Sequence, residues 1–134
     1  HLTETDVQTG TENEELIGTF KIKKLYTWHK DVTGVDAWKT RASKTTINLY
    51  KNNNGKVRFV CRETTTNKLR LNHYVPKKRN NTNRENCVAW ASTDSTASND
   101  YNENDNVVFQ FLAKFNNNDD KIAFENKFDE IINN

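Results

Sequence analysis

The sequence is poor in the residues that build covalent and phosphate-binding frameworks. Its 134 residues include two cysteines, four glycines, one proline and no methionine. Two cysteines are too few for a disulfide scaffold, so Cys61 and Cys87 are expected to be reduced thiols in the core. Four glycines leave no glycine-rich phosphate loop, and no apolar run approaches the roughly 20 residues that a bilayer-spanning helix needs. We expect a soluble, intracellular protein with one domain and one core.

Catalytic and metal-binding groups are also scarce. His29 and His73, the internal histidines, have no Cys, Asp or Glu at metal-ligand spacing. No serine lies in a nucleophile-elbow sequence, and residues 21–84 contain only three carboxylates for acid–base chemistry. We therefore expect a protein that is not an enzyme and that binds no metal or cofactor.

The most informative stretch is residues 55–74. Val57, Phe59 and Cys61 alternate with Arg58 and Arg62, which is the period of a strand with one buried face. A second alternating run, residues 69–74, follows after a short polar segment, so the two runs are expected to form an antiparallel hairpin. Arg58, Arg62 and Arg70 would then lie on its outer face as a cationic surface.

Further alternating segments surround this hairpin. They occupy residues 20–28, 45–51, 86–91 and 107–112, with a bulge or change of face expected at Lys24 and Leu25. Residues 38–41 lead into the segment at 45–51. Asn54-Gly55 is a hairpin turn signal, while residues 29–37 and 92–105 are expected to be loops. From Asp119 onward, Phe124, Phe128 and Ile131 are spaced as on one face of a helix. The sequence predicts a mainly β fold: a barrel or orthogonal sandwich of about seven antiparallel strands capped by one C-terminal α-helix, as in pleckstrin-homology-like domains.

The net charge of +2 hides a strong asymmetry along the chain. Residues 1–20 carry five acids and no Lys or Arg, residues 21–84 carry 17 Lys and Arg against three acids, and the remainder carries three lysines against ten acids. Residues 1–15 have no apolar period, so we expect a flexible acidic N-terminal arm before a folded domain at residues 16–134. The basic middle predicts an anionic partner surface.

Several short motifs resemble the ordered landmarks of the Ran-binding domain family, of the one-domain Ran-binding protein 1 type. They are EEL at 14–16, KLYTW at 24–28, WKTR at 38–41, GKVRFVCR at 55–62, NHY at 72–74 and a late Trp90. The resemblance extends over about residues 12–131. Ala42, Ser43 and Lys44 stand where the family usually has glycines, and Val88 stands where it has a tryptophan.

This resemblance implies a pleckstrin-homology-like module without catalysis that grips the GTP form of the small GTPase Ran. It implies a role in nucleocytoplasmic transport, in which the module helps release Ran·GTP from transport receptors and promotes hydrolysis by the separate GTPase-activating protein. It also implies a monomer that works in the cytoplasm, at the nuclear pore or while shuttling, with no nucleic-acid or membrane partner.

The family's binding mode implies two sets of contact residues. In the family, the domain's acidic arm reaches the GTPase, and the acidic end of the GTPase's C-terminal extension lies on a basic face of the domain. The residues expected to bind Ran are Glu12, Glu14, Glu15, Lys24, Trp38, Lys39, Arg41, Arg62, Asn72 and Tyr74. The basic patch expected to hold the acidic extension is Lys21, Lys23, Lys77, Lys78 and Arg79. Trp38 is predicted to be a contact residue in an exposed loop, and His73 is as well explained by a core position as by binding.

Two other functions fit parts of the sequence. An EVH1-like module would hold a proline-rich peptide with exposed aromatics such as Tyr26, Trp28 and Trp38, but it does not need the basic middle. A domain that binds anionic lipid or RNA would use the cationic surface, but the acidic arm would repel either polyanion.

Overall fold

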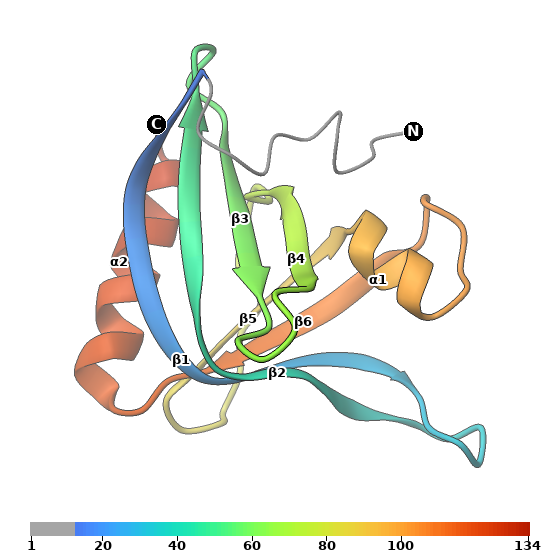
Figure 1. Cartoon of the computed structure of the whole chain (residues 1–134). Helices are drawn as coiled ribbons and strands as arrows, with labels where there is room; N and C mark the ends of the chain where they lie inside the picture. Colours follow the sequence, from blue (N-terminus) through green and yellow to red (C-terminus); the bar gives the residue numbers. More distant parts are fainter. Residues whose placement is uncertain (1–12) are drawn as a thin grey trace.

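The computed structural model describes residues 13–134. These residues form β1 (Glu14–Lys30), β2 (Asp36–Asn52), β3 (Val57–Arg62), β4 (Leu69–Tyr74), β5 (Cys87–Thr93), α1 (Ser95–Asp100), β6 (Val108–Lys114) and α2 (Asn118–Ile132). The strands make one antiparallel sheet in the order β4-β3-β2-β1-β6-β5. The sheet curls into a half-barrel, with α2 along one side next to β1 and α1 beside β4 (Figure 1). The predicted mainly β fold with a C-terminal helix is confirmed.

Aromatic side chains form most of the core between the sheet and α2. Phe124 and Phe128 of α2 are fully buried, and their rings lie 5.5 and 5.3 Å from Phe59 of β3. Trp90 of β5 is also fully buried and lies 5.9 Å from each of these two α2 rings. The helical stripe read from the sequence is therefore the face that covers the sheet, and Asn117 caps the helix by accepting the Asp120 N–H.

The central hairpin has the predicted pairing and the predicted buried face. Phe59 lies opposite His73 and Cys61 lies opposite Leu71, and all four residues are buried. Gly55, with a φ of 81°, makes the predicted turn between β2 and β3. The prediction of an outward Arg58 is wrong, because this side chain is fully buried on the other face of the strand.

Two very long strands, β1 and β2, account for the largest differences from the predicted layout. Leu25 lies opposite Ala42 and Tyr26 lies opposite Thr40, so Arg41 is an extra residue in β2. The extra residue belongs to β2 and not to the segment 20–28, where a bulge or change of face was predicted. In β1 itself, Ile22 and Leu25 are three residues apart and both are buried in the main core, so the buried face changes near Leu25 as predicted. Residues 13–134 contain six strands, where about seven were predicted, and β2 runs without interruption from Asp36 to Asn52.

Two predicted loops are partly regular structure. Only residues 31–35 separate β1 from β2, and Trp38 lies in β2, so its prediction as a loop residue is wrong. The polar run 92–105 contains α1, whose N-cap is Asp94. The sequence missed this helix because six residues are too few to show an apolar helical period.

The predicted acidic arm falls largely outside the described residues. Glu12 and the residues before it belong to that part of the chain, whereas Glu14 and Glu15 are the first residues of β1. Lys44, which stands where the resemblance to the Ran-binding domain family predicts a glycine, has a φ of 50° within β2. A side chain thus occupies a backbone conformation that glycine adopts without strain.

Candidate functional site

An exposed pair of tryptophans marks the part of the β1–β2 ribbon that extends beyond the rest of the sheet. Trp28 of β1 and Trp38 of β2 are directly opposite each other, and their rings meet edge to face with centroids 5.2 Å apart. Trp28 is 40% exposed and Trp38 is half-buried. Large aromatic side chains that remain exposed but are held against each other are typical of protein-contact surfaces.

A groove continues from Trp38 across the outer face of β1, β6 and β5. Its lining combines apolar or aromatic side chains with charged ones: Tyr26, Trp38, Cys87, Leu112, Arg84, Glu85 and Lys114. Tyr26 and Trp38 pack on the small buried cluster of Cys87, Ala89 and Leu112, which is separate from the main core. Burial raises the pKa of the Cys87 thiol, so this cysteine lines the groove as a neutral, apolar group.

The groove is also a place of positive charge. Lys24 of β1 lies opposite Lys114 of β6 in the strand register, so the two side chains share a face of the sheet. Lys39 lies opposite Thr27 and therefore on the other face of the ribbon from Trp38. Neither Arg84 nor Lys114 forms an ion pair with a carboxylate among residues 13–134. The arrangement suits a partner segment that carries apolar side chains beside acidic ones.

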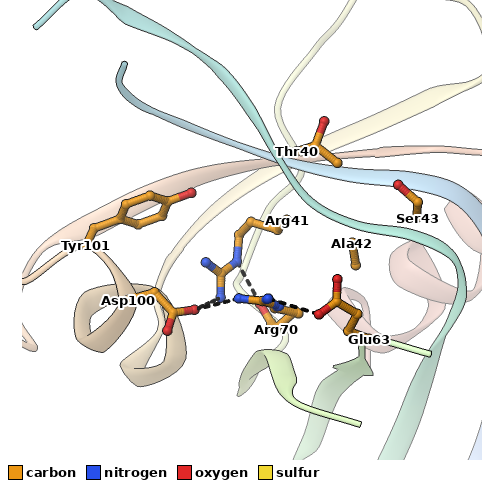
Figure 2. A pocket seen from close by; sticks show the side chains of 8 residues that line it. All are labelled: Thr40, Arg41, Ala42, Ser43, Glu63, Arg70, Asp100 and Tyr101. Carbon is orange, nitrogen blue, oxygen red and sulfur yellow. Dashed lines mark hydrogen bonds and ion pairs between the residues drawn. The ribbon is translucent and has the colours of Figure 1, made fainter. Parts of the chain in front are cut away.

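Arg41 lies instead in a polar pocket between β2, β4 and α1, whose lining side chains are drawn in Figure 2. Its guanidinium contacts the Asp100 carboxylate at 3.1 Å and the Arg70 backbone carbonyl at 3.0 Å, and only 2% of the side chain is exposed. Arg70 lies between Asp100 at 3.2 Å and Glu63 at 3.0 Å (Figure 2). Burial alone would raise the pKa of Asp100, but hydrogen bonds and charge from Lys68 and Arg41 hold it below its usual value. Arg41 is therefore committed to joining α1 to the sheet.

Two other predicted contact residues are also held by internal ion pairs. The Glu14 carboxylate accepts hydrogen bonds from Arg58 at 2.7 and 2.8 Å, and its side chain is 5% exposed. Arg79 donates to Asp129 of α2 at 2.7 Å and to Glu125 at 3.3 Å. Both contacts fasten chain segments to the domain, so they offer little free charge to a partner.

The remaining basic residues of the predicted patch are exposed and lie on two different segments of the chain. Lys21 and Lys23 are exposed on β1, and Lys77 and Lys78 are exposed after the end of β4. Strands β3 and β2 lie between β4 and β1 in the sheet, so the two pairs project from separated elements. Arg62 at the end of β3 donates to the Asn67 carbonyl at 2.8 Å.

The NHY motif is mostly internal. His73 contacts Asp94 through Nδ1 at 2.7 Å, and its Nε2 accepts the Trp90 indole N–H at 2.9 Å, so the neutral ring carries its proton on Nδ1. Asn72 is 3% exposed, and its side-chain oxygen accepts a hydrogen bond from Arg58 at 2.9 Å. Tyr74 alone is exposed, with the Lys56 ammonium 4.8 Å from its ring centre. Of the two roles left open for His73, a core position and a binding contact, the structure shows the core position.

Asp94 and the position of Cys87 at the groove were not predicted from the sequence. Asp94 is 2% exposed and joins α1 to β4, because it caps the helix and accepts the Asn72 N–H and the His73 contact. An aspartate followed by Ser-Thr-Ala has the form of a helix N-cap, and this signal could have revealed it. Cys87 was predicted as a core thiol, but its place beneath an open groove has no sequence signature.

The described part of the chain offers neither a metal centre nor a membrane anchor. Residues 13–134 contain no group of three His, Cys, Asp or Glu side chains that could hold a metal ion. Within the same residues, no helix has the length and apolar character to cross a bilayer.

Comparisons with known proteins agree on the family and on the fold. The family model described as the RanBP1 domain matches residues 6–134. A 74-residue segment, 55% of the chain, is 39% identical to Ran-binding protein 1 homolog a of Arabidopsis thaliana and spans 31% of that protein. The crystal structure of the Ran-binding domain of Nup2 from Ashbya gossypii aligns over 91% of this chain and 97% of that one, with a TM-score of 0.67 and 21% identity. A second crystal structure described as that Nup2 domain aligns over 87% and 97%, with a TM-score of 0.58 and 19% identity. The pleckstrin-homology-like architecture is thereby confirmed, and the chain belongs to the RanBP1 domain family.

Proposed function

We propose that this protein binds the GTP form of Ran and has no catalytic activity of its own. The observation that carries the proposal is the exposed Trp28–Trp38 pair, which adjoins a groove of mixed apolar and cationic lining. A family model for the RanBP1 domain and relatives named for Ran binding support the choice of partner.

The groove fits the C-terminal extension of Ran better than it fits a small ligand. An extended acidic segment can place an apolar side chain against Tyr26 and Trp38 while its carboxylates meet Lys114 and Arg84. Lys24, opposite Lys114 in the register, adds positive charge on the groove side of the sheet, whereas Lys39 is predicted to contact Ran from the other face of the ribbon. Among the predicted acidic contacts, Glu12 and Glu15 keep this role in the proposal, whereas the Glu14 carboxylate is paired internally.

The preference for GTP follows if nucleotide state controls whether Ran's extension is free to bind. A domain that holds the extension can then discriminate between the two states by its differential affinity. In the cell this protein would help release Ran·GTP from transport receptors and assist hydrolysis by the GTPase-activating protein, in the cytoplasm or at the nuclear pore.

Calorimetry with Ran loaded with a GTP analogue or with GDP tests the proposal. The protein should bind the GTP form far more tightly, and Trp38→Ala should lose about 2 kcal/mol of binding free energy, roughly 30-fold in Kd. Val108→Ala is the matched control, because Val108 is an apolar side chain of β6 that is 62% exposed and does not line the groove. Urea unfolding of each variant separates lost binding from lost stability.

The outcomes distinguish the parts of the proposal. If the protein binds neither Ran·GTP nor Ran·GDP, the proposed function is refuted. Equal affinity for the two forms refutes only the preference for GTP. Equal losses for Trp38→Ala and Val108→Ala would mean that the groove is not the contact surface. Binding to anionic vesicles in a parallel assay would favour the lipid alternative.

A further inference from the structure

The ribbon that presents the two tryptophans lacks the support that the sheet gives to the rest of β1. Pairing between β1 and β6 ends at Thr27 and Phe111, whereas β1 and β2 remain paired as far as Lys30 and Asp36. Figure 1 shows this end of β1 and β2 extending away from the half-barrel to a tip beyond the other strands. An isolated two-stranded hairpin is only marginally stable in water, so other contacts are needed to fix its orientation.

One side chain of the ribbon makes such contacts with the segment between α1 and β6. The His29 ring stacks on Tyr101, with centroids 4.3 Å apart and planes inclined by 17°, and lies 6.2 Å from the Phe109 ring. Its Nε2 is 3.0 Å from a Glu103 carboxylate oxygen. These contacts join residues more than 70 positions apart in the chain, so they cannot arise from local hairpin pairing.

The strand geometry gives His29 a direct relation to the tryptophan pair. Successive side chains of a strand point to opposite faces, so His29 holds one face of the ribbon while Trp28 is presented on the other. The ring binds Glu103 through Nε2, while its Nδ1 is buried and has no hydrogen-bond partner among residues 13–134. A ring that donates Nε2–H to Glu103 satisfies this geometry, and the stack on Tyr101 then sets the ring plane.

We infer that His29 is a positioning residue, which fixes the ribbon so that Trp28 and Trp38 are already in place when the partner arrives. The inference rests on the proposed function, because it assigns a role in binding to a contact that touches no partner. Fixing a binding element in its bound conformation reduces the entropy that association must remove. Loss of the His29 contacts should therefore weaken binding while the main core stays intact.

Hydrogen exchange and binding, measured together, test this role. In His29→Ala, backbone amides of residues 28–30 and 36–38 should exchange faster, while those of β3 keep the wild-type rate. The affinity for Ran loaded with a GTP analogue should fall roughly three- to ten-fold. His29→Phe restores the stack on Tyr101 and should recover most of both effects. Lys30→Ala is the matched control, since its exposed ammonium is 3.6 Å from Asp36 within the ribbon itself.

Each result decides for or against the inference. Unchanged exchange in the ribbon of His29→Ala refutes the positioning role, whatever Ran does. Faster exchange with wild-type affinity refutes it as well, because ribbon order would then be irrelevant to binding. If the wild-type protein binds Ran in neither nucleotide state, the proposed function fails and the role of His29 in binding fails with it. If Trp38→Ala loses binding and His29→Ala does not, the function stands and this inference falls.

Discussion

The variant Glu14→Gln tests whether the Glu14 carboxylate stabilises the folded protein. Glu14 begins β1, and its two carboxylate oxygens meet the Arg58 Nε at 2.8 Å and Nη2 at 2.7 Å. The side chains are 5% and 1% exposed, and the third contact of the guanidinium is the Asn72 oxygen at 2.9 Å. Glu14→Gln keeps the shape of the side chain but removes the charge that compensates Arg58.

The expected loss of stability is large for a domain of this size. Removing one partner of a buried ion pair leaves an uncompensated charge and costs about 3–5 kcal/mol. The lower end applies here, because glutamine still offers one oxygen to the guanidinium. A loss of about 3 kcal/mol is a substantial part of the roughly 5–15 kcal/mol by which such domains are stable. The double variant Glu14→Leu with Arg58→Met should recover most of this loss, since no charge is then buried.

Urea unfolding followed by tryptophan fluorescence measures the effect. Glu15→Gln is the matched control, because Glu15 is the exposed neighbour in the same strand and its change should stay within about 0.5 kcal/mol. If Glu14→Gln unfolds at the same urea concentration as Glu15→Gln, the ion pair does not stabilise the start of β1. If the double variant is as unstable as Glu14→Gln, the cause is lost packing or the lost hydrogen bond to the buried Asn72 oxygen, and not an unpaired charge.

Two further substitutions test the backbone of β2 and the link between α1 and β4. Lys44→Gly should stabilise the protein by about 0.5–1 kcal/mol in urea unfolding, because it relieves a left-handed backbone at φ 50°. Ser43→Gly, the control, should destabilise the protein by a similar amount. If both variants change stability in the same direction, the reasoning is contradicted. Burial alone would raise the pKa of Asp94, but hydrogen bonds from His73 and Thr96 hold it below the usual 3.8. Because the pKa of Asp94 is lower in the folded protein, the ionised carboxylate stabilises the fold above pH 3.8, and this stabilisation is lost as the pH falls through the pKa of the folded protein. Asp94→Asn should therefore lower the free energy of unfolding by about 2 kcal/mol or more at pH 7 and by less near pH 3. A difference that stays constant between these pH values would show that the charge of Asp94 is not the cause.

Local patterns in the sequence were sufficient for most elements of the fold. The alternation of Val57, Phe59 and Cys61 predicts a strand with these three side chains buried, and the structure buries all three. The prediction that the other face is exposed is wrong, because Arg58 and Val60 are buried as well. The spacing of Phe124 and Phe128 predicts the helical face that covers the sheet. Such patterns can be read because the period of a strand or helix is a property of neighbouring residues.

The candidate site was only partly predictable. Trp38 and Lys39 were expected near the contact surface, and the structure places Trp38 beside the groove. Trp38 was expected in a loop because the residues of β1 and β2 beyond Thr27 include polar side chains on both faces. The sequence there shows no clear alternation of apolar and polar residues. Tyr26 and Leu112 lie 86 positions apart in the sequence, so their meeting in the groove depends on the pairing of β1 with β6.

The sequence by itself determined the strand and helix periods, the turn at Gly55 and the excess of positive charge in residues 21–84. Only the tertiary structure decided which of those charges remain free. Arg58 finds Glu14 at a separation of 44 residues and Arg41 finds Asp100 at 59, and both guanidiniums become internal. Lys114 and Arg84 find no carboxylate among the described residues and remain at the groove. The reason is physical: the hydrophobic period predicts which face of a strand or helix packs on the core. Whether a charged side chain on the other face is buried and neutralised depends on which distant strand or helix is folded against it.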